Sequence, residues 1–149
     1  MRAVVQRVSE AAVHVGERCT GRIGVGLLVL VGVGNSDSKA DVSYLAAKLV
    51  GLRVFEDEQG RMNRSVSEAG GSILCVSQFT LHGDARKGRR PSYNGAASPD
   101  LAQPLFDALC TEIRELGVPV ETGEFGAMMT VSMTGNGPVT VLVDSKKQF

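Results

Sequence analysis

The sequence contains no tryptophan, only 5% aromatic residues, two histidines and three cysteines. The cysteines, Cys19, Cys75 and Cys110, are far apart and form no Cys-x-x-Cys pair, which predicts reduced thiols in a cytoplasmic protein. His14 and His82 have no histidine or cysteine neighbour at the spacing of a local zinc site. We therefore expect no catalytic metal.

Long apolar runs and an excess of charge are also missing. The apolar run 23–33 is interrupted by three glycines and is too short to cross a bilayer. The N-terminus shows no signal peptide. The 16 basic and 16 acidic residues cancel, which argues against non-specific nucleic-acid binding and against an anionic membrane partner. Binding to RNA would then require a local basic patch.

The length and composition of the chain predict a single α+β domain over residues 1–149. Apolar segments predict strands at 2–8, 11–15, 19–23, 23–33, 52–55, 72–79, 118–122, 128–134 and 139–143. Because strands outnumber helices, we expect a mostly antiparallel sheet or open barrel with two main helices packed on it.

The two helices have recognisable ends. The first begins at Ser38, with Asp41 in the position of a weak capping box, and ends at Gly51. The second begins at Ser98, and Pro104 within it is expected to kink the helix or delay its regular start. Between the strands and the second helix, residues 80–98 show no periodicity, which predicts a long functional loop.

Two short segments at the edges of apolar runs lie about sixty residues apart, Ser77–Leu81 and Gly135–Thr140. On residue type alone, Ser77 and Thr80 are typical of hydroxyl groups that satisfy the backbone where a strand ends. Likewise, Asn136-Gly137 is typical of a hairpin turn.

In their order, their spacing and the chain length, the two segments resemble the signature motifs of the D-aminoacyl-tRNA deacylases, which remove D-amino acids from mischarged tRNA. The segments Met1–Val8 and Phe125–Met129 also fit, so the resemblance covers essentially the whole chain. It implies a cytoplasmic homodimer with two composite active sites. Without a cofactor, each site would hydrolyse the ester between a D-amino acid and the terminal adenosine of tRNA.

The resemblance assigns Ser77, Gln78, Phe79 and Thr80 to a catalytic wall, where backbone amides and the Gln78 side chain face the substrate. Thr80 is either a nucleophile, which is weak without an adjacent base, or a positioning residue. In the second case the 2′-hydroxyl of the terminal ribose assists the reaction, and we favour this interpretation. His82 is two residues away, but the family pattern gives it no role as a base.

The resemblance also implies that the Gly137–Pro138 bond is cis and that this dipeptide enters the pocket of the opposite subunit. Its carbonyl oxygens would exclude an L-side chain there. Glycine has no side chain, so glycine mischarged on alanine tRNA is an expected second substrate. Arg7 matches the position that braces the dipeptide, and Phe125 and Met129 match pocket-lining positions. The alternatives are that Arg7 is a plain surface arginine and that Phe125 and Met129 are ordinary core residues.

Arg86, Lys87, Arg89 and Arg90 form the densest positive patch of the sequence. Their place after the Ser77–Leu81 segment predicts contacts with acceptor-stem phosphates, although such a run is also typical of a solvated loop. Two other functions remain open. One is a non-enzymatic RNA-binding module, and the other is a small hydrolase that acts on free D-amino acid esters or peptides through Thr80.

Overall fold

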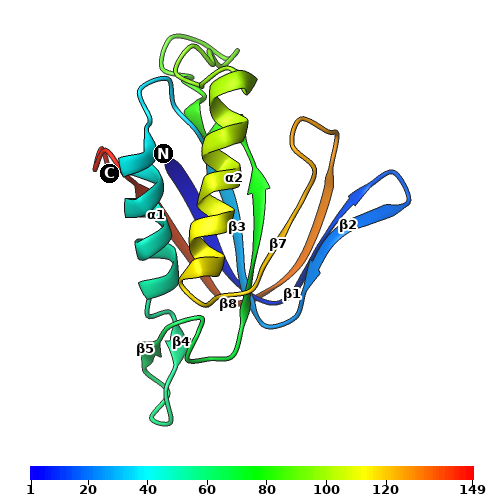
Figure 1. Ribbon diagram of the computed structural model, residues 1–149, viewed down its shortest axis with the longest axis vertical. Coiled ribbons are helices and arrows are strands. Elements are labelled where there is room, and N and C mark those ends of the chain that lie inside the picture. Colours follow the sequence, from blue (N-terminus) through cyan, green and yellow to red (C-terminus); the bar gives the residue numbers. More distant parts are fainter.

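The computed structural model describes residues 1–149 as a curved sheet with two helices on one face (Figure 1). Helices α1 (Lys39–Gly51) and α2 (Pro99–Glu115) lie side by side. The remaining elements are β1 (Arg2–Val15), β2 (Arg18–Ile23), β3 (Gly26–Gly32), β4 (Phe55–Glu56), β5 (Met62–Arg64), β6 (Ser72–Ser77), the 3₁₀ helix η1 (Phe79–His82), β7 (Val120–Thr122) and β8 (Thr130–Asp144). Neither helix combines the length and hydropathy that a membrane crossing requires.

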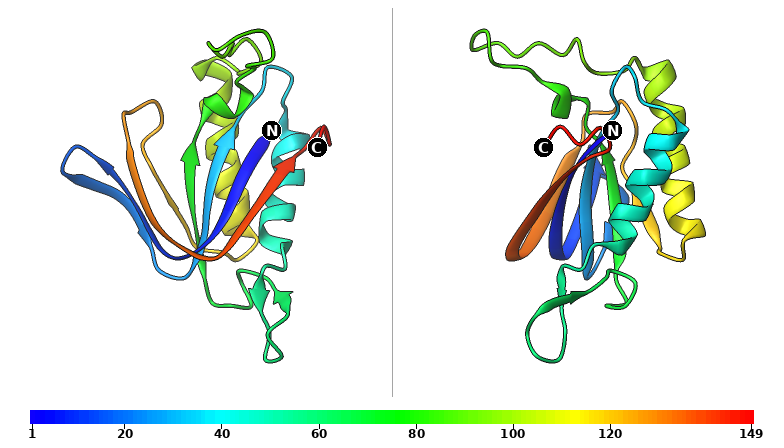
Figure 2. Two further views of the ribbon diagram at one scale, coloured as in Figure 1. Left: turned by 180° about the vertical axis from the view of Figure 1, so that it is seen from behind. Right: turned by 90° about the vertical axis from the view of Figure 1, so that its left-hand side faces the viewer.

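The long strand β1 organises the sheet. It pairs antiparallel with β3 through its first half, with β2 through its second half, and with β8 along nearly its whole length. Beyond β3 the sheet continues through β6 and β7 as parallel neighbours. The outer part of β1 curves away with β2 and β8, so the sheet curls towards an open barrel (Figure 2). The expected α+β architecture is confirmed.

The central strands β3 and β6 are apolar on both faces because both faces are covered. Val29 and Cys75 belong to the main core, which lies between the sheet and the helices and includes Leu109 of α2. Leu28 and Leu74 point to the opposite face and join a second cluster inside the curl, with apolar residues of β1 and β2. The side chains of one strand therefore alternate between two cores.

Helix α1 begins as predicted, with a complete capping box. The Ser38 backbone N–H donates to the Asp41 carboxylate at 2.8 Å. The same carboxylate accepts hydrogen bonds from Ser145 at 2.7 Å and from Lys146 at 2.9 Å. Burial opposes ionisation of Asp41, but these bonds outweigh it and hold its pKa well below the ordinary range. The C-terminal segment is thereby fastened to α1.

Several strand boundaries differ from the sequence prediction. The segments 2–8 and 11–15 are one continuous strand, β1, and the run 23–33 is divided between β2 and β3. The pairing with β1 is interrupted at Gly24 and Val25, between the pairs Ala11–Ile23 and Val8–Gly26, and Val25 is 51% exposed there. The segments 128–134 and 139–143 are also one strand, β8. The hairpin turn considered for Asn136-Gly137 is therefore wrong.

The second helix and the loop before it also differ from expectation. Helix α2 starts at Pro99 and runs through Pro104 without interruption, so its regular start is not delayed. Residues 80–98 contain most of η1 and a closed loop in which Asp84 and Ser92 exchange two backbone hydrogen bonds of 2.8 and 2.9 Å. We call this loop the 84–92 hairpin.

His82 ends η1 and packs against the end of β3. A Cβ built on Gly32 or Gly34 would lie 3.1 or 3.0 Å from its ring, so only glycine leaves room for the imidazole there. The ring atom Nε2 is buried and has no hydrogen-bond partner. Burial lowers the pKa of His82 below its ordinary value of 6.5, and the nearby charge of Arg2 lowers it further. Asp37 and the Gly32 backbone act in the opposite direction.

We expect this histidine to make the fold sensitive to mild acid. Because the folded-state pKa is lowered, the full stability is present above about pH 6.5 and is lost as the pH falls through the folded value. Urea unfolding between pH 7.5 and 5 measures the free energy of unfolding. His82→Gln, which cannot take up a proton, is expected to flatten the decline. The same change at His14 is the control, and flattening there instead would contradict the assignment.

Candidate active site

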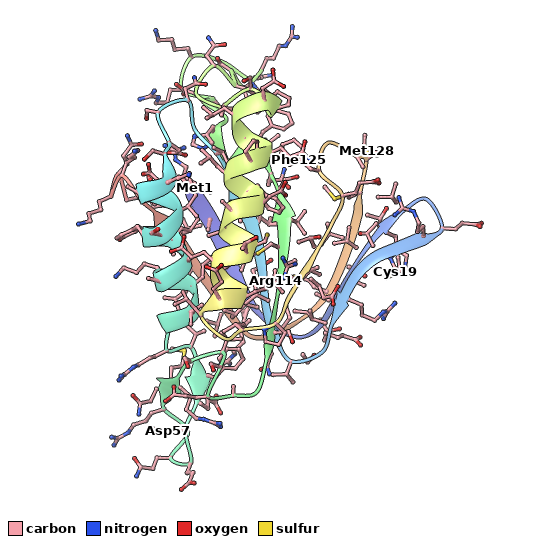
Figure 3. All side chains as sticks on the ribbon, in the orientation of Figure 1. Met1, Cys19, Asp57, Arg114, Phe125 and Met128 are labelled. Carbon is pink, nitrogen blue, oxygen red and sulfur yellow. The ribbon has the colours of Figure 1, made fainter.

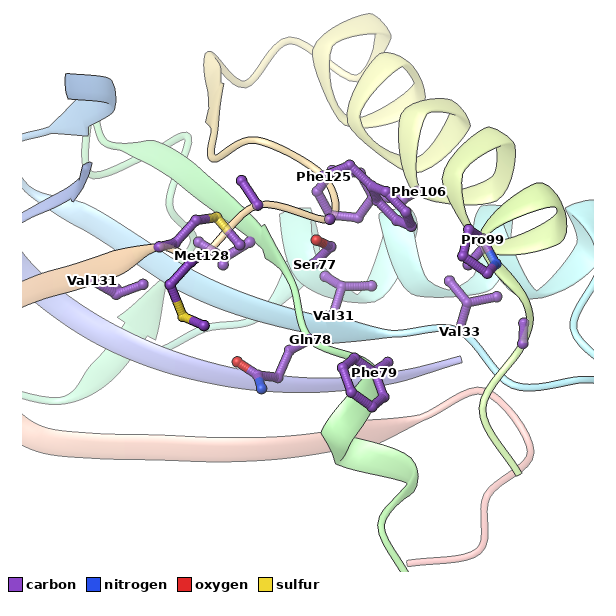
Figure 4. Close-up of a pocket in the computed structure, with 16 residues that line it drawn as sticks. Val31, Val33, Ser77, Gln78, Phe79, Pro99, Phe106, Phe125, Met128 and Val131 are labelled. Atoms are coloured by element: carbon purple, nitrogen blue, oxygen red, sulfur yellow. The ribbon is translucent and has the colours of Figure 1, made fainter. Parts of the chain in front are cut away.

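A cavity of about 660 Å³ opens where β3 and β6 end (Figure 4). It is lined by the end of β3, the end of β6 with the start of η1, the first turns of α2, and the loop between β7 and β8 with the start of β8. Its lining residues are Val31, Val33, Val76, Ser77, Gln78, Phe79, Ala97, Pro99, Ala102, Phe106, Phe125, Gly126, Ala127, Met128, Met129 and Val131. A mostly apolar cavity of this size with a few polar groups is typical of a small-molecule site.

The polar side chains of the cavity come from the predicted wall. Strand β6 ends at Ser77, and Gln78 donates its backbone N–H to Val31 at 2.7 Å before the chain turns into η1. Because the chain leaves the sheet here, consecutive residues no longer alternate, and Ser77, Gln78 and Phe79 all face the cavity. The first backbone N–H groups of a helix, here those of Phe79 and Thr80, have no partner within the helix itself.

Thr80 lies beside this wall and does not line the cavity. Its hydroxyl accepts a hydrogen bond from the Gln78 side chain. His82, the titratable side chain closest in sequence, turns away towards Gly32 and Gly34 and lines a separate polar cavity of about 270 Å³. The arrangement provides no base for the Thr80 hydroxyl.

The loop between β7 and β8 forms the opposite side of the cavity. Phe125 and Met129 line it, as the sequence suggested. The ring of Phe125 lies 6.2 Å from that of Phe106 on α2, which joins the loop to the helix. Met128 stands at the end of the loop and is 91% exposed (Figure 3). Phe106 was missed from sequence because its position in the apolar stripe of α2 resembles that of any core residue.

The second motif lies in a bulge of β8. Between the pairs Gln6–Thr140 and Val8–Gly135, the single residue Arg7 faces the four residues Asn136–Val139. The bulge contains the Gly137–Pro138 bond, which is cis as predicted. Gly137 has a φ of +132°, and an added Cβ would lie 2.8 Å from the backbone nitrogen of Val139, so only glycine fits.

Arg7 holds the base of this bulge. Its side chain is 7% exposed, and it donates to the carbonyl oxygens of Asn136 at 3.0 Å and Val54 at 2.6 Å. No ion pair of the chain includes it. Arg7 is therefore a buried cation between backbone carbonyls, and the alternative of a plain surface arginine is wrong.

The two motifs do not meet within one chain. Ser77, Gln78, Phe79, Phe125 and Met129 surround the cavity, whereas Arg7, Gly137 and Pro138 take no part in its lining. Gly137 and Pro138 are exposed on β8. A contact between the dipeptide and a cavity of this kind would have to come from a second copy of the chain.

The basic residues occupy the 84–92 hairpin. Arg86 is bound to Asp84 through two hydrogen bonds of 2.9 and 2.6 Å. This pairing holds the pKa of Asp84 well below its ordinary range. Lys87, Arg89 and Arg90 are exposed and form no ion pair. Arg86 is therefore already paired, whereas the other three cations have no acidic partner within the chain.

Other titratable groups do not assemble into a second reactive centre. No group of three or more histidine, cysteine, aspartate or glutamate side chains is arranged to hold a metal ion. None of the three cysteines forms a disulfide in the structure. A hydrogen bond to Cys110 and complete burial raise the pKa of the Cys75 thiol.

Comparison with known proteins places these features in a family. A family model described as D-Tyr-tRNA(Tyr) deacylase matches residues 4–144. A protein of Symbiobacterium thermophilum named D-aminoacyl-tRNA deacylase is 55% identical over 149 residues, which cover 100% of this chain and 99% of that protein. One of Roseiflexus sp. with the same name is 57% identical over 145 residues, 97% of this chain and 94% of that protein.

Solved structures share the fold. One titled c-Myc DNA Unwinding Element Binding Protein is 37% identical, covers 97% of this chain and 98% of its own, and superimposes with a TM-score of 0.92. A structure titled as a probable eukaryotic D-amino acid tRNA deacylase is 19% identical with a TM-score of 0.80, covers 95% and 97%, and shows the same fold. The chain belongs to the D-Tyr-tRNA(Tyr) deacylase family.

Proposed function

We propose that this protein is a cytoplasmic hydrolase that cleaves the ester bond between a D-amino acid and the terminal adenosine of tRNA. The observation that carries the proposal is the cavity at the end of β6, where Ser77 and Gln78 supply the polar side chains in an otherwise apolar lining. The relatives that share more than half of its residues are named for this activity.

The cavity supplies binding groups for an ester. The backbone N–H of Phe79, which lines the cavity at the start of η1, is the proposed donor for the carbonyl oxygen, on which negative charge develops when the ester is attacked. The apolar part between Phe106, Phe125 and Met129 has room for the adenosine. Such a site acts by orientation and electrostatic stabilisation, without a covalent intermediate.

The attacking water must then be activated by the substrate. A hydroxyl nucleophile needs an adjacent base, and Thr80 has only the Gln78 amide beside it. The 2′-hydroxyl of the terminal ribose adjoins the ester and is available in every tRNA. We assign the assisting role to that group and a positioning role to Thr80.

A second copy of the chain completes the site in this proposal. The exposed bulge of Gly137 and Pro138 offers backbone carbonyls on a firm support, since Arg7 fixes its base. Large apolar side chains are exposed around the cavity mouth and along β8, among them Met128, Met133 and Leu142. Exposed apolar surface of this kind favours association with another protein surface. Two chains related by a twofold axis would exchange their dipeptides.

Backbone carbonyls at the α-carbon explain selection by chirality. A D-amino acid would present its amino group and hydrogen to that wall, whereas an L-side chain would collide with it. Because the collision involves only backbone, the filter is indifferent to the identity of the D-side chain. Glycine has no side chain to collide, so glycine mischarged on alanine tRNA is proposed as a second substrate.

The first test compares D-tyrosyl-tRNA with L-tyrosyl-tRNA by release of the amino acid. We expect a preference for the D-ester of about a thousandfold or more, which corresponds to roughly 4 kcal/mol. One methylene in a looser pocket contributes only about 1–3 kcal/mol, so a preference of this size requires a collision. Binding without turnover of either ester would support the RNA-binding module instead.

The second test separates Thr80 from the substrate hydroxyl. Because the Thr80 hydroxyl contacts no base, Thr80→Ala is expected to keep its rate within about tenfold of the original protein. A tRNA that ends in 2′-deoxyadenosine is expected to react at least about a hundredfold more slowly, the contribution of one positioned proton-transfer group. Single-turnover rates give both values. The opposite pattern, with normal binding and folding, would identify Thr80 as the nucleophile.

The third test asks whether one site uses two chains. In Gly137→Ala the added methyl meets the Val139 backbone and displaces the dipeptide, whereas Gln78→Ala alters only the cavity wall. Either variant alone is expected to be inactive. Heterodimers assembled from the two and purified by different tags are expected to recover about half of the original activity, because one intact cavity meets one intact dipeptide.

The controls address folding and assembly. Circular dichroism and urea unfolding of each variant check that the substitutions stay local, since Gly137→Ala changes a strained bulge and not only an exposed side chain. Purified heterodimers without recovered activity would mean that each site is built from one chain.

A further inference from the structure

We infer that the aromatic pair Phe79 and Tyr93, together with the 84–92 hairpin, binds the unpaired nucleotides that precede the terminal adenosine of the substrate RNA. One base stacks on the aromatic pair, and the cations of the hairpin contact the phosphates. The inference rests on the proposed function, since it follows the same substrate outward from the cavity.

The aromatic pair begins at the cavity. The rings of Phe79 and Tyr93 lie with their centres 5.2 Å apart and their planes at 70°. Phe79 lines the cavity and is 58% exposed, and Tyr93 is 40% exposed. The two rings therefore form an aromatic surface that continues from the cavity wall to the outside of the molecule.

The surface is held in place before any ligand arrives. The ring of Tyr93 packs on the backbone of Gly83, where an added Cβ would lie 3.1 Å from the ring. The Tyr93 carbonyl accepts a hydrogen bond from Ala96 at 2.9 Å, and the Asn94 carbonyl accepts one from the Asn35 side chain at 2.6 Å. A fixed aromatic ring loses little conformational entropy on binding.

Unpaired cations lie next to this surface. Tyr93 follows directly after the 84–92 hairpin, in which Asp84 neutralises Arg86 and shapes the base of the loop. Lys87, Arg89 and Arg90 are exposed without acidic partners. The hairpin projects from the end of the molecule that carries η1 (Figure 2). Three free positive charges therefore stand beyond the aromatic pair.

This combination matches the chemistry of single-stranded RNA. Aromatic rings stack on splayed bases of any identity, and nearby cations follow the phosphate backbone. Double-stranded RNA would not offer a free base face. The unpaired nucleotides next to the terminal adenosine are the ones that an ester bound in the cavity would bring to this surface.

The test compares the hydrolysis of two substrates. One is D-tyrosyl-tRNA, and the other is the D-tyrosyl ester of adenosine, which lacks the preceding nucleotides. Tyr93→Ala is expected to raise KM for D-tyrosyl-tRNA about tenfold, the loss of one stacked base. Its kcat and its kinetics with the adenosine ester are expected to stay unchanged. Tyr93→Phe keeps the ring and is expected to behave as the original protein, whereas Tyr93→Leu is not.

The cations are tested by the salt dependence of KM for D-tyrosyl-tRNA. Replacing Arg89 and Arg90 together with glutamine is expected to reduce the slope of log KM against log salt by about 0.7 for each phosphate that the hairpin no longer binds. Arg61→Gln is the matched control, an exposed arginine in the hairpin of β4 and β5 at the opposite end of the molecule. It is expected to change neither KM nor the slope.

The outcomes separate this inference from the proposed function. If Tyr93→Ala changed the kinetics with both substrates equally, Tyr93 would act on the part of the substrate bound in the cavity and not on the preceding nucleotides. If it changed the kinetics with neither substrate, no base would stack on Tyr93. In both cases the original protein still hydrolyses D-tyrosyl-tRNA. If it hydrolysed neither substrate, the proposed function itself would be wrong.

Discussion

The arrangement of the second motif depends on the guanidinium of Arg7 in the middle of β1. A buried cation is costly unless its donors are satisfied, and here two backbone carbonyls, those of Asn136 and Val54, satisfy them. A hydrogen bond to a charged group contributes about 1.5–3 kcal/mol, so the bulge of β8 is fixed by strong bonds at its base. The segment before β4 is fixed by the same side chain. Gly137 and Pro138 are therefore presented to the outside on a rigid support.

The cavity lies where strands β3 and β6 end. Strand β6 is buried on both faces until Ser77, and the chain then leaves the sheet for η1, which turns three consecutive residues towards one space. Phe106 of α2 and the loop before β8 close that space with apolar surface. The polar groups are few and are mostly held by the backbone, which suits a reaction that depends on orientation. The cavity and the Gly137–Pro138 bulge are thus placed on different strands.

Local patterns in the sequence were sufficient for the fold class. Hydrophobic periodicity located both helices, and the capping residues Ser38 and Ser98 marked their starts correctly. Boundaries were wrong where long-range pairing decides them. The run 23–33 was divided because its pairing with β1 is interrupted at Gly24 and Val25, and α2 continues through Pro104 without interruption. Such outcomes depend on partners far away in the chain.

The sequence by itself determined the two motifs, the reduced cysteines, the basic run and the succession of strands and helices, because each depends on residues near one another in the chain. The folded structure shows that Arg86 pairs with Asp84, two residues before it in the chain, whereas Arg89 and Arg90 are free. Only the tertiary structure decided that Gly137 lies in a bulge opposite Arg7, outside the cavity of its own chain. The physical reason is strand register: β1 and β8 are more than a hundred residues apart, and only their pairing fixes which side chains face the bulge.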